Sequence, residues 1–224
     1  MGVTWDPLFL SLRVATMATC LTLVVGTGLA LLLTWRKLPA SNLVDALVSA
    51  PLVLPPTVLG YYLLVALGTE SAVGRAWERL TGTTIVFTFT GAVVAAAVGS
   101  LPLVVRSIRV GLESIDHNLI SAARTLGASP VRVLFTVVLP LAAPGIIAGA
   151  MLGFARALGD YGITQMVAGS RIDGVPTASI YVMDAMVANR EHDARMMAIA
   201  TTIVGVVLLY LANRLTRRLH PHRG

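Results

Sequence analysis

The chain has 224 residues, of which 56% are hydrophobic and only 12% are charged, with a net charge of +6. This composition is too apolar for a soluble domain and is typical of a polytopic membrane protein. The single cysteine, Cys20, excludes an internal disulfide framework and a cysteine-cluster metal site.

Five apolar segments are long enough to cross the hydrocarbon core of a membrane. In chain order, we expect spans at residues 8–34, 43–67, 85–105, 140–168 and 196–215. The second span contains Pro51, Pro55 and Pro56, and the proline pair is expected to break its helix. Short helices are expected at residues 73–80 and 177–188 of the polar connections. The chain is therefore predicted to be all-α, with about five transmembrane helices in one domain over residues 1–224.

The basic residues predict the orientation of the chain. Five spans place the two termini on opposite sides, and the polar stretch at about 111–139 is assigned to the cytoplasm. The cytoplasmic side then carries Arg36, Lys37, Arg106, Arg109, Arg124, Arg132, Arg214, Arg217, Arg218 and Arg223, and the other side carries Arg75, Arg79, Arg171, Arg190 and Arg195. This bias agrees with the positive-inside rule, with the N-terminus outside and the C-terminus cytoplasmic. The positive charge is thus a topology signal, and no nucleic-acid partner is expected.

The stretch at 111–139 has the pattern of two short helices. Asp116 can cap the first, and Gly127 stands where that helix ends, because glycine adopts the left-handed conformation without strain. Ser129 can cap the second helix, and Pro130 suits its first position.

This stretch resembles the cytoplasmic coupling loop of the permease subunits of bacterial ABC importers. The family pattern is Glu-Ala-Ala, then Gly, then Leu-Pro about a dozen residues later. Here the matching residues are Ala122, Ala123, Gly127, Leu139 and Pro140, whereas Ser121 stands where the family has the acid. The resemblance implies a type I importer fold and a loop that lies in a groove of the ATPase subunit; the alternative is an amphipathic loop that packs only on its own bundle. The coupling residues it implies are Ser121, Ala122, Ala123, Arg124, Leu126, Gly127 and Pro130.

Nothing in the sequence predicts an enzyme. A phosphate-binding P-loop needs a glycine-rich run ending in Gly-Lys-Ser/Thr, and the only lysine, Lys37, lies outside any such run. We therefore expect no catalytic residue, metal site or cofactor in this chain, with ATP and magnesium bound by a separate ATPase. A membrane-embedded enzyme would need converging groups inside the spans, where the only charged residues more than two positions from a span end are Arg13, Arg156 and Asp160.

The fourth span carries a face of small residues, Gly145, Gly149 and Gly153, at intervals of four. Such a face lets another helix approach closely in a membrane. The sequence leaves open whether the partner is another span or a second subunit.

Arg156 and Asp160 lie one helical turn apart in the same span and can form an ion pair. The run from Arg156 to Gly162 resembles the Arg-Ala-Leu-Gly-Glu-Phe-Gly stretch of molybdate and related oxyanion permeases, with Asp160 in place of Glu and Tyr161 in place of Phe. Two interpretations stay open: an ion pair that holds a kink, or part of the pathway lining.

The run from Pro51 to Tyr62 resembles the Pro-Leu-Val-Leu-Pro-Pro and Gly-Tyr sequence of the molybdate branch. The candidates for the pathway or a gate are Pro55, Pro56, Gly60, Arg156, Asp160 and Tyr161.

The resemblance implies a permease subunit of an ATP-driven importer of molybdate, with tungstate as a further substrate and a sulfate or thiosulfate importer as the alternative. It also implies a location in the cytoplasmic (inner) membrane and a homodimer with two ATPase subunits and an extracytoplasmic oxyanion-binding protein as partners.

Overall fold

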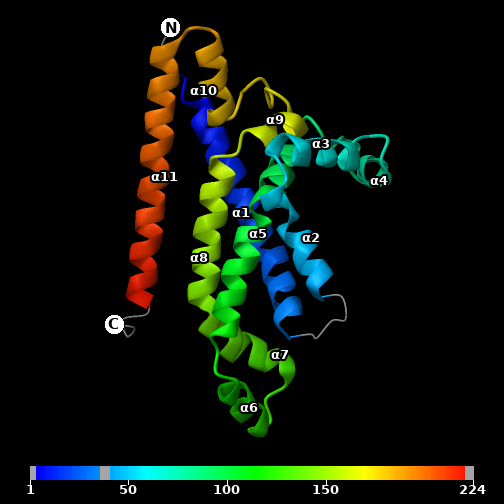
Figure 1. The fold of residues 1–224 in the computed structure, drawn as a ribbon, viewed down its shortest axis with the longest axis vertical. Coiled ribbons are helices and arrows are strands. Elements are labelled where there is room, and N and C mark those ends of the chain that lie inside the picture. The colour runs from blue at the N-terminus through cyan, green and yellow to red at the C-terminus, as the bar shows by residue number, and fades with distance from the viewer. Residues whose placement is uncertain (1–3, 36–40, 220–224) are drawn as a thin grey trace.

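The computed structural model describes residues 4–35 and 41–219, and within them the regular structure is helical (Figure 1). The elements are α1 (Asp6–Trp35), α2 (Ser41–Val53), α3 (Pro56–Leu67), α4 (Ala72–Thr81), α5 (Phe89–Glu113), α6 (His117–Thr125), α7 (Pro130–Val133), the π-helical segment η1 (Leu134–Val138), α8 (Leu139–Leu158), α9 (Gly162–Ala168), α10 (Ala178–Val187) and α11 (Glu191–Leu219). This confirms the predicted all-α class. Four described helices are long and apolar enough to cross a membrane, and a bent pair, α2 with α3, could make a fifth.

The core is formed by α1, α5 and α8, which all contact one another (Figure 1). The buried face of α5 is built largely from small residues such as Ala92, Ala96 and Gly99, which let the neighbouring helices come close. Of the four long helices, α5 is the most buried and α11 the least. Most of the surface of α11 is therefore left for lipid or for a partner.

The span expected over residues 43–67 is broken at its proline pair. It consists of two helices, α2 and α3, and the chain bends by 118° between them. Proline lacks a backbone N–H and its ring clashes with the preceding turn, so the helix cannot continue through Pro55 and Pro56. Pro55 has a φ of −54° and a ψ of 137°, which is not helical, and Pro56 begins α3. The second half of the expected span thus runs crosswise to the bundle (Figure 1).

The third expected span, residues 85–105, also needs revision. Helix α5 begins later, at Phe89, because Thr88 caps it by accepting a hydrogen bond from the amide of Gly91. Phe87, just before the cap, has a φ of 60° and lies outside the helix. At its other end α5 continues to Glu113, which brings it to the polar stretch that carries α6 and α7.

The fourth span starts earlier and ends earlier than residues 140–168. One helical run of 29 residues, Pro130–Leu158, joins α7, η1 and α8. It ends at Leu158, and α9 is a separate short helix that begins at Gly162. The fifth span, expected at 196–215, starts earlier, at Glu191.

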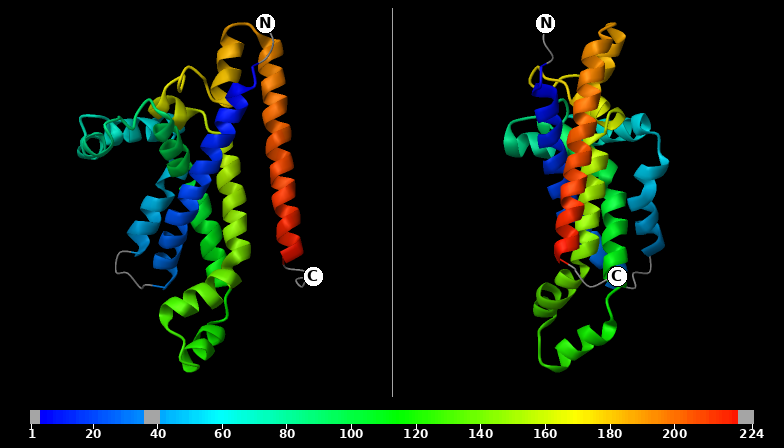
Figure 2. Two further views of the ribbon diagram at one scale, coloured as in Figure 1. Left: turned by 180° about the vertical axis from the view of Figure 1, so that it is seen from behind. Right: turned by 90° about the vertical axis from the view of Figure 1, so that its left-hand side faces the viewer.

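The two ends of the bundle differ in what they carry. Helices α6 and α7 and the end of α11 lie at one end, whereas the start of α1 and helix α10 lie at the other (Figures 1 and 2). The described chain termini therefore lie at opposite ends, as an odd number of crossings requires. Three basic residues used to predict the orientation, Arg36, Lys37 and Arg223, lie outside the described residues.

Candidate functional site

Local capping hydrogen bonds define the two short helices in the loop between α5 and α8. Asp116 Oδ1 accepts a hydrogen bond from the backbone N–H of Asn118 at 2.9 Å and so caps α6. Ser129 Oγ accepts from the backbone N–H of Arg132 at 3.3 Å, and Pro130 is the first residue of α7. Both caps satisfy amide groups that a helix start leaves without a partner.

The turn between the two helices is a Schellman motif centred on Gly127. The amide of Gly127, which has a φ of 82°, donates to the carbonyl oxygen of Arg124 at 2.9 Å. The next amide, that of Ala128, donates to the carbonyl oxygen of Ala123 at 3.1 Å. These two bonds fix the angle between the helices, because the last carbonyl groups of α6 are bonded by the turn itself.

One face of this loop packs on the bundle and another stays open. Ile120 and Val133 are buried in a cluster with residues of α5 and the end of α1. Leu126, in contrast, is 89% exposed. The loop therefore packs on its own bundle by one face and leaves another face uncovered. Between α6 and α7 lies a cavity of about 260 Å³ whose polar lining includes Ser121 and Arg124. A partner that reaches the open end of the bundle would meet both the cavity and the exposed leucine.

The glycine face of α8 meets α5 of the same chain. A Cβ atom added to Gly145 would lie 2.8 Å from the Cα of Gly111, so the two backbones touch where neither residue has a side chain. The hydroxyl of Ser107 donates to the carbonyl oxygen of Gly145 at 3.1 Å, and a Cβ on Gly149 or Gly153 would press on Val104. The helix that packs on this glycine face is therefore another span of the same chain, α5.

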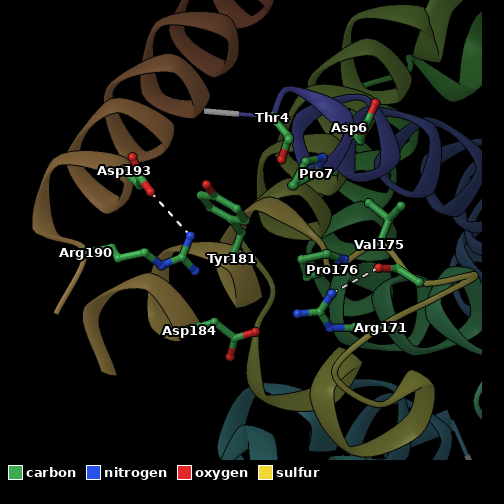
Figure 3. Close-up of a pocket in the computed structure, with 11 residues that line it drawn as sticks. Thr4, Asp6, Pro7, Arg171, Val175, Pro176, Tyr181, Asp184, Arg190 and Asp193 are labelled. Atoms are coloured by element: carbon green, nitrogen blue, oxygen red, sulfur yellow. Dashed lines mark hydrogen bonds and ion pairs between the residues drawn. The ribbon is translucent and has the colours of Figure 1, made fainter. Parts of the chain in front are cut away.

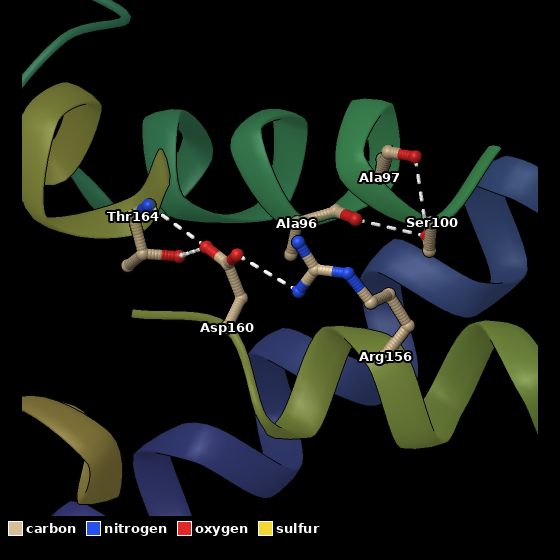
Figure 4. A network of polar contacts seen from close by, with 6 residues as sticks. All are labelled: Ala96, Ala97, Ser100, Arg156, Asp160 and Thr164. Atoms are coloured by element: carbon tan, nitrogen blue, oxygen red, sulfur yellow. Dashed lines mark hydrogen bonds and ion pairs between the residues drawn. The ribbon is translucent and has the colours of Figure 1, made fainter. Parts of the chain in front are cut away.

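At the far end of α8, Arg156, Asp160 and Thr164 form a polar network inside the bundle (Figure 4). Arg156 Nη1 lies 3.0 Å from Asp160 Oδ1. Asp160 Oδ2 accepts two more hydrogen bonds, from the backbone N–H of Thr164 at 2.9 Å and from its hydroxyl at 2.8 Å. Thr164 is a member that the sequence analysis missed, although it follows Asp160 by four residues, as Asp160 follows Arg156.

The helix break and the start of α9 pack against each other. A Cβ on Gly162 would lie 2.9 Å from Cβ of Pro56, and a Cβ on Gly60 would lie 2.7 Å from Cβ of Met166. The structure thus brings Pro56 and Gly60 next to the segment that follows Asp160. Tyr161, in that segment, keeps an exposed side chain.

A polar pocket of about 370 Å³ lies at the end of the bundle opposite the loop (Figure 3). The start of α1, residues 171–176, α10 and α11 line it. Arg190 Nη1 is 3.3 Å from Asp193 Oδ2, and its guanidinium lies 5.9 Å from the ring centre of Tyr181. Arg171 donates to the carbonyl oxygen of Gly174, and Asp184 also faces the pocket. This pocket was not predicted from the sequence.

The long apolar helices and the capped two-helix loop at one end define a helical membrane protein. Residues 23–224 match the family model described as "Binding-protein-dependent transport system inner membrane component", and the chain belongs to this family. It is therefore a multi-pass membrane component of a transport system.

The relatives are transport permeases that align over most of their length. The chain is 42% identical over 209 residues to the molybdenum transport system permease protein ModB of Escherichia coli K12, covering 92% of this chain and 90% of the relative. It is 38% identical over 201 residues to the protein of the same name from Azotobacter vinelandii, covering 90% and 89%. A probable sulfate transport system permease protein of Chlorokybus atmophyticus is 31% identical over 212 residues, covering 92% and 71%.

Among solved structures, the chain resembles the inward-facing MetNI methionine ABC transporter. The TM-score is 0.71 at 19% identity, with coverage of 97% of this chain and 96% of the other. At this identity the likeness concerns the fold, which is that of a type I ABC importer permease.

Proposed function

We propose that this chain is the membrane-spanning permease subunit of an ATP-driven molybdate importer. The observation that carries the proposal is the full-length likeness to molybdenum permeases, at 42% and 38% identity, against 31% for the sulfate relative. Tungstate, an oxyanion of the same shape and charge, is a further substrate. Sulfate or thiosulfate import is the second candidate, because the sulfate relative also aligns with 92% of this chain.

The loop of α6 and α7 transmits motion from an ATPase subunit into the membrane. The helical run Pro130–Leu158 has no loop between the coupling end and the far end of α8. Because α8 touches α5 backbone to backbone at Gly145 and Gly111, the two helices can shift together. Rigid elements of this kind carry displacement as rigid-body motion rather than as a local distortion.

The partners follow from this role. Two copies of the chain enclose the pathway, two ATPase subunits bind ATP and magnesium and dock on the coupling loops, and an extracytoplasmic binding protein delivers the oxyanion. The chain itself binds no cofactor and catalyses no reaction. The N-terminus faces outside and the C-terminus the cytoplasm, so the polar pocket beside Arg171 and Arg190 faces the binding protein.

The test is transport by the reconstituted complex. The permease, its ATPase and its binding protein are placed in proteoliposomes, and ATP-dependent uptake of molybdate is measured with sulfate as competitor. Uptake of molybdate that a large excess of sulfate leaves intact is the expected result. Uptake of sulfate in preference to molybdate would replace the first candidate by the second.

A further inference from the structure

Arg156 is a charged residue within a span, and the acid with which it pairs, Asp160, is deeply buried. The side chain of Asp160 is 3% exposed, whereas that of Arg156 is 30% exposed. Both oxygens of Asp160 are engaged, one by Arg156 and the other by Thr164. Both carboxylate oxygens of Asp160 are therefore hydrogen-bonded, and its side chain is buried away from solvent. The guanidinium of Arg156 is the member of the pair that can contact another molecule.

The guanidinium of Arg156 has N–H groups that are not hydrogen-bonded to any described residue. Arg156 Nη1 bonds to Asp160, and its other nitrogens have no acceptor within residues 4–35 and 41–219. These nitrogens are not enclosed, in contrast to Nε of Arg109, which is buried without a partner. The side chain lies beside α5, because a Cβ added to Gly99 would be 3.8 Å from Nη2, an ordinary contact distance. Nearby Ser100 turns its hydroxyl to the carbonyl oxygens of Ala96 and Ala97 instead (Figure 4).

The position of Arg156 along the membrane suits a transit site. It is in the last turn of α8, about 25 Å along the helix from Leu139 at 1.5 Å per residue. It thus lies toward the end opposite the coupling loop, beside the junction of α9 with the broken pair α2 and α3. Charged residues within spans face a partner or a water-filled cavity. Arg156 has a partner in Asp160, and its side chain is still 30% exposed.

We propose that Arg156 is an anion ligand of the translocation pathway, with Asp160 and Thr164 as positioning residues. This inference rests on the proposed function, because it assumes that an oxyanion crosses between two copies of the chain. The planar guanidinium offers paired N–H groups that match two oxygens of a tetrahedral dianion. Asp160 keeps the arginine in place and reduces its attraction for the anion, which suits a site that must also release its ligand.

The experiment uses the complete complex in proteoliposomes, with molybdate as the transported probe. The variants are Arg156→Gln, Asp160→Asn and the double variant, and the matched control is Arg13→Gln, which removes an arginine from another span. Complex yield is measured together with the maximal uptake rate and the concentration of loaded binding protein that gives half of that rate.

An anion ligand predicts a specific pattern. Arg156→Gln and the double variant should lower maximal uptake about tenfold or more, the equivalent of one charge-assisted hydrogen bond. The half-saturating concentration of binding protein should not change, because that protein binds outside the membrane. Asp160→Asn should reduce uptake less than Arg156→Gln, and Arg13→Gln should behave like the parent.

Two results would overturn the proposal. One is a double variant that assembles and transports like the parent, which would show that the pair is only structural and that each single change harms by stranding a charge. The other is parent-like uptake by Arg156→Gln itself.

A further variant, Arg156→Lys, keeps the test decisive if the neutral variants do not assemble. Lysine retains the charge and the contact with Asp160 but lacks the fork of donors. A parent-like yield with maximal uptake several-fold lower supports the ligand role, and parent-like uptake refutes it. A parent complex that fails to take up molybdate would instead refute the proposed function, so the two failures are distinguishable.

Discussion

Replacement of Gly127 by valine tests whether the geometry of the α6–α7 turn transmits the ATPase signal. A Cβ at Gly127 meets nothing within 4 Å, so the added Cβ atom causes no clash. The penalty is conformational, because residue 127 has a φ of 82°. For an L-residue this region costs about 1–2 kcal/mol, and a β-branched side chain tolerates it least.

The turn can also open instead of accepting the strained conformation, and the free-energy cost of opening limits how large the destabilisation can be. If it opens to relieve the strain, it loses the hydrogen bonds from Gly127 to Arg124 and from Ala128 to Ala123. At about 0.5–1.5 kcal/mol each, this costs as much as the strain itself. The native turn should therefore lose roughly tenfold in relative population, since about 1.4 kcal/mol corresponds to a factor of ten.

The assay is ATP hydrolysis stimulated by loaded binding protein in the reconstituted complex. We expect Gly127→Val to reduce this stimulation strongly while the spans remain inserted. Gly127→Asn is the first control, because asparagine enters the left-handed region readily. Gly82→Val is the second: it has a φ of 72° and equally empty surroundings but ends α4, and it should keep the stimulation. Parent-like stimulation in Gly127→Val would refute the reasoning.

Three further predictions concern assembly, packing and orientation. The permease purified alone should neither bind nor hydrolyse ATP, and native mass measurement of the co-expressed complex should give two permease and two ATPase chains; a mass with one permease would remove the homodimer. Gly145→Val should destabilise the bundle by more than the usual 1–3 kcal/mol of an overpacked core, because its Cβ would lie 2.8 Å from Gly111 Cα, whereas Gly28→Val, with open space around it, should melt like the parent. In a Cys20→Ser background, a cysteine introduced at Asn118 should react with an impermeant thiol reagent only in inside-out vesicles and one at Gly174 only in right-side-out cells; the reverse pattern would invert the topology.

The features that the sequence predicted well are those set by neighbours in the chain. Asp116, Gly127 and Ser129 each act on backbone groups no more than three residues away, so their side-chain chemistry alone defines the turn between α6 and α7. The pairing of Arg156 with Asp160 is of the same kind, since one helical turn brings the two side chains within reach. Apolar length likewise located the long helices, although the ends moved where Thr88 capped α5 and where α8 stopped at Leu158.

What the sequence could not supply depends on residues far apart in the chain. The prolines predicted a break near Pro55. The bend of 118° between α2 and α3 also depends on the contact of α3 with α9, more than a hundred residues later in the chain. The small face of Gly145 would suit any close helix, and only the folded chain assigns it to Gly111 of α5. In the same way, the ion pair is local, but the burial of Asp160 and the exposure of Arg156 are not. Exposure depends on which helices surround a side chain, and those helices are brought together by packing that no local pattern encodes.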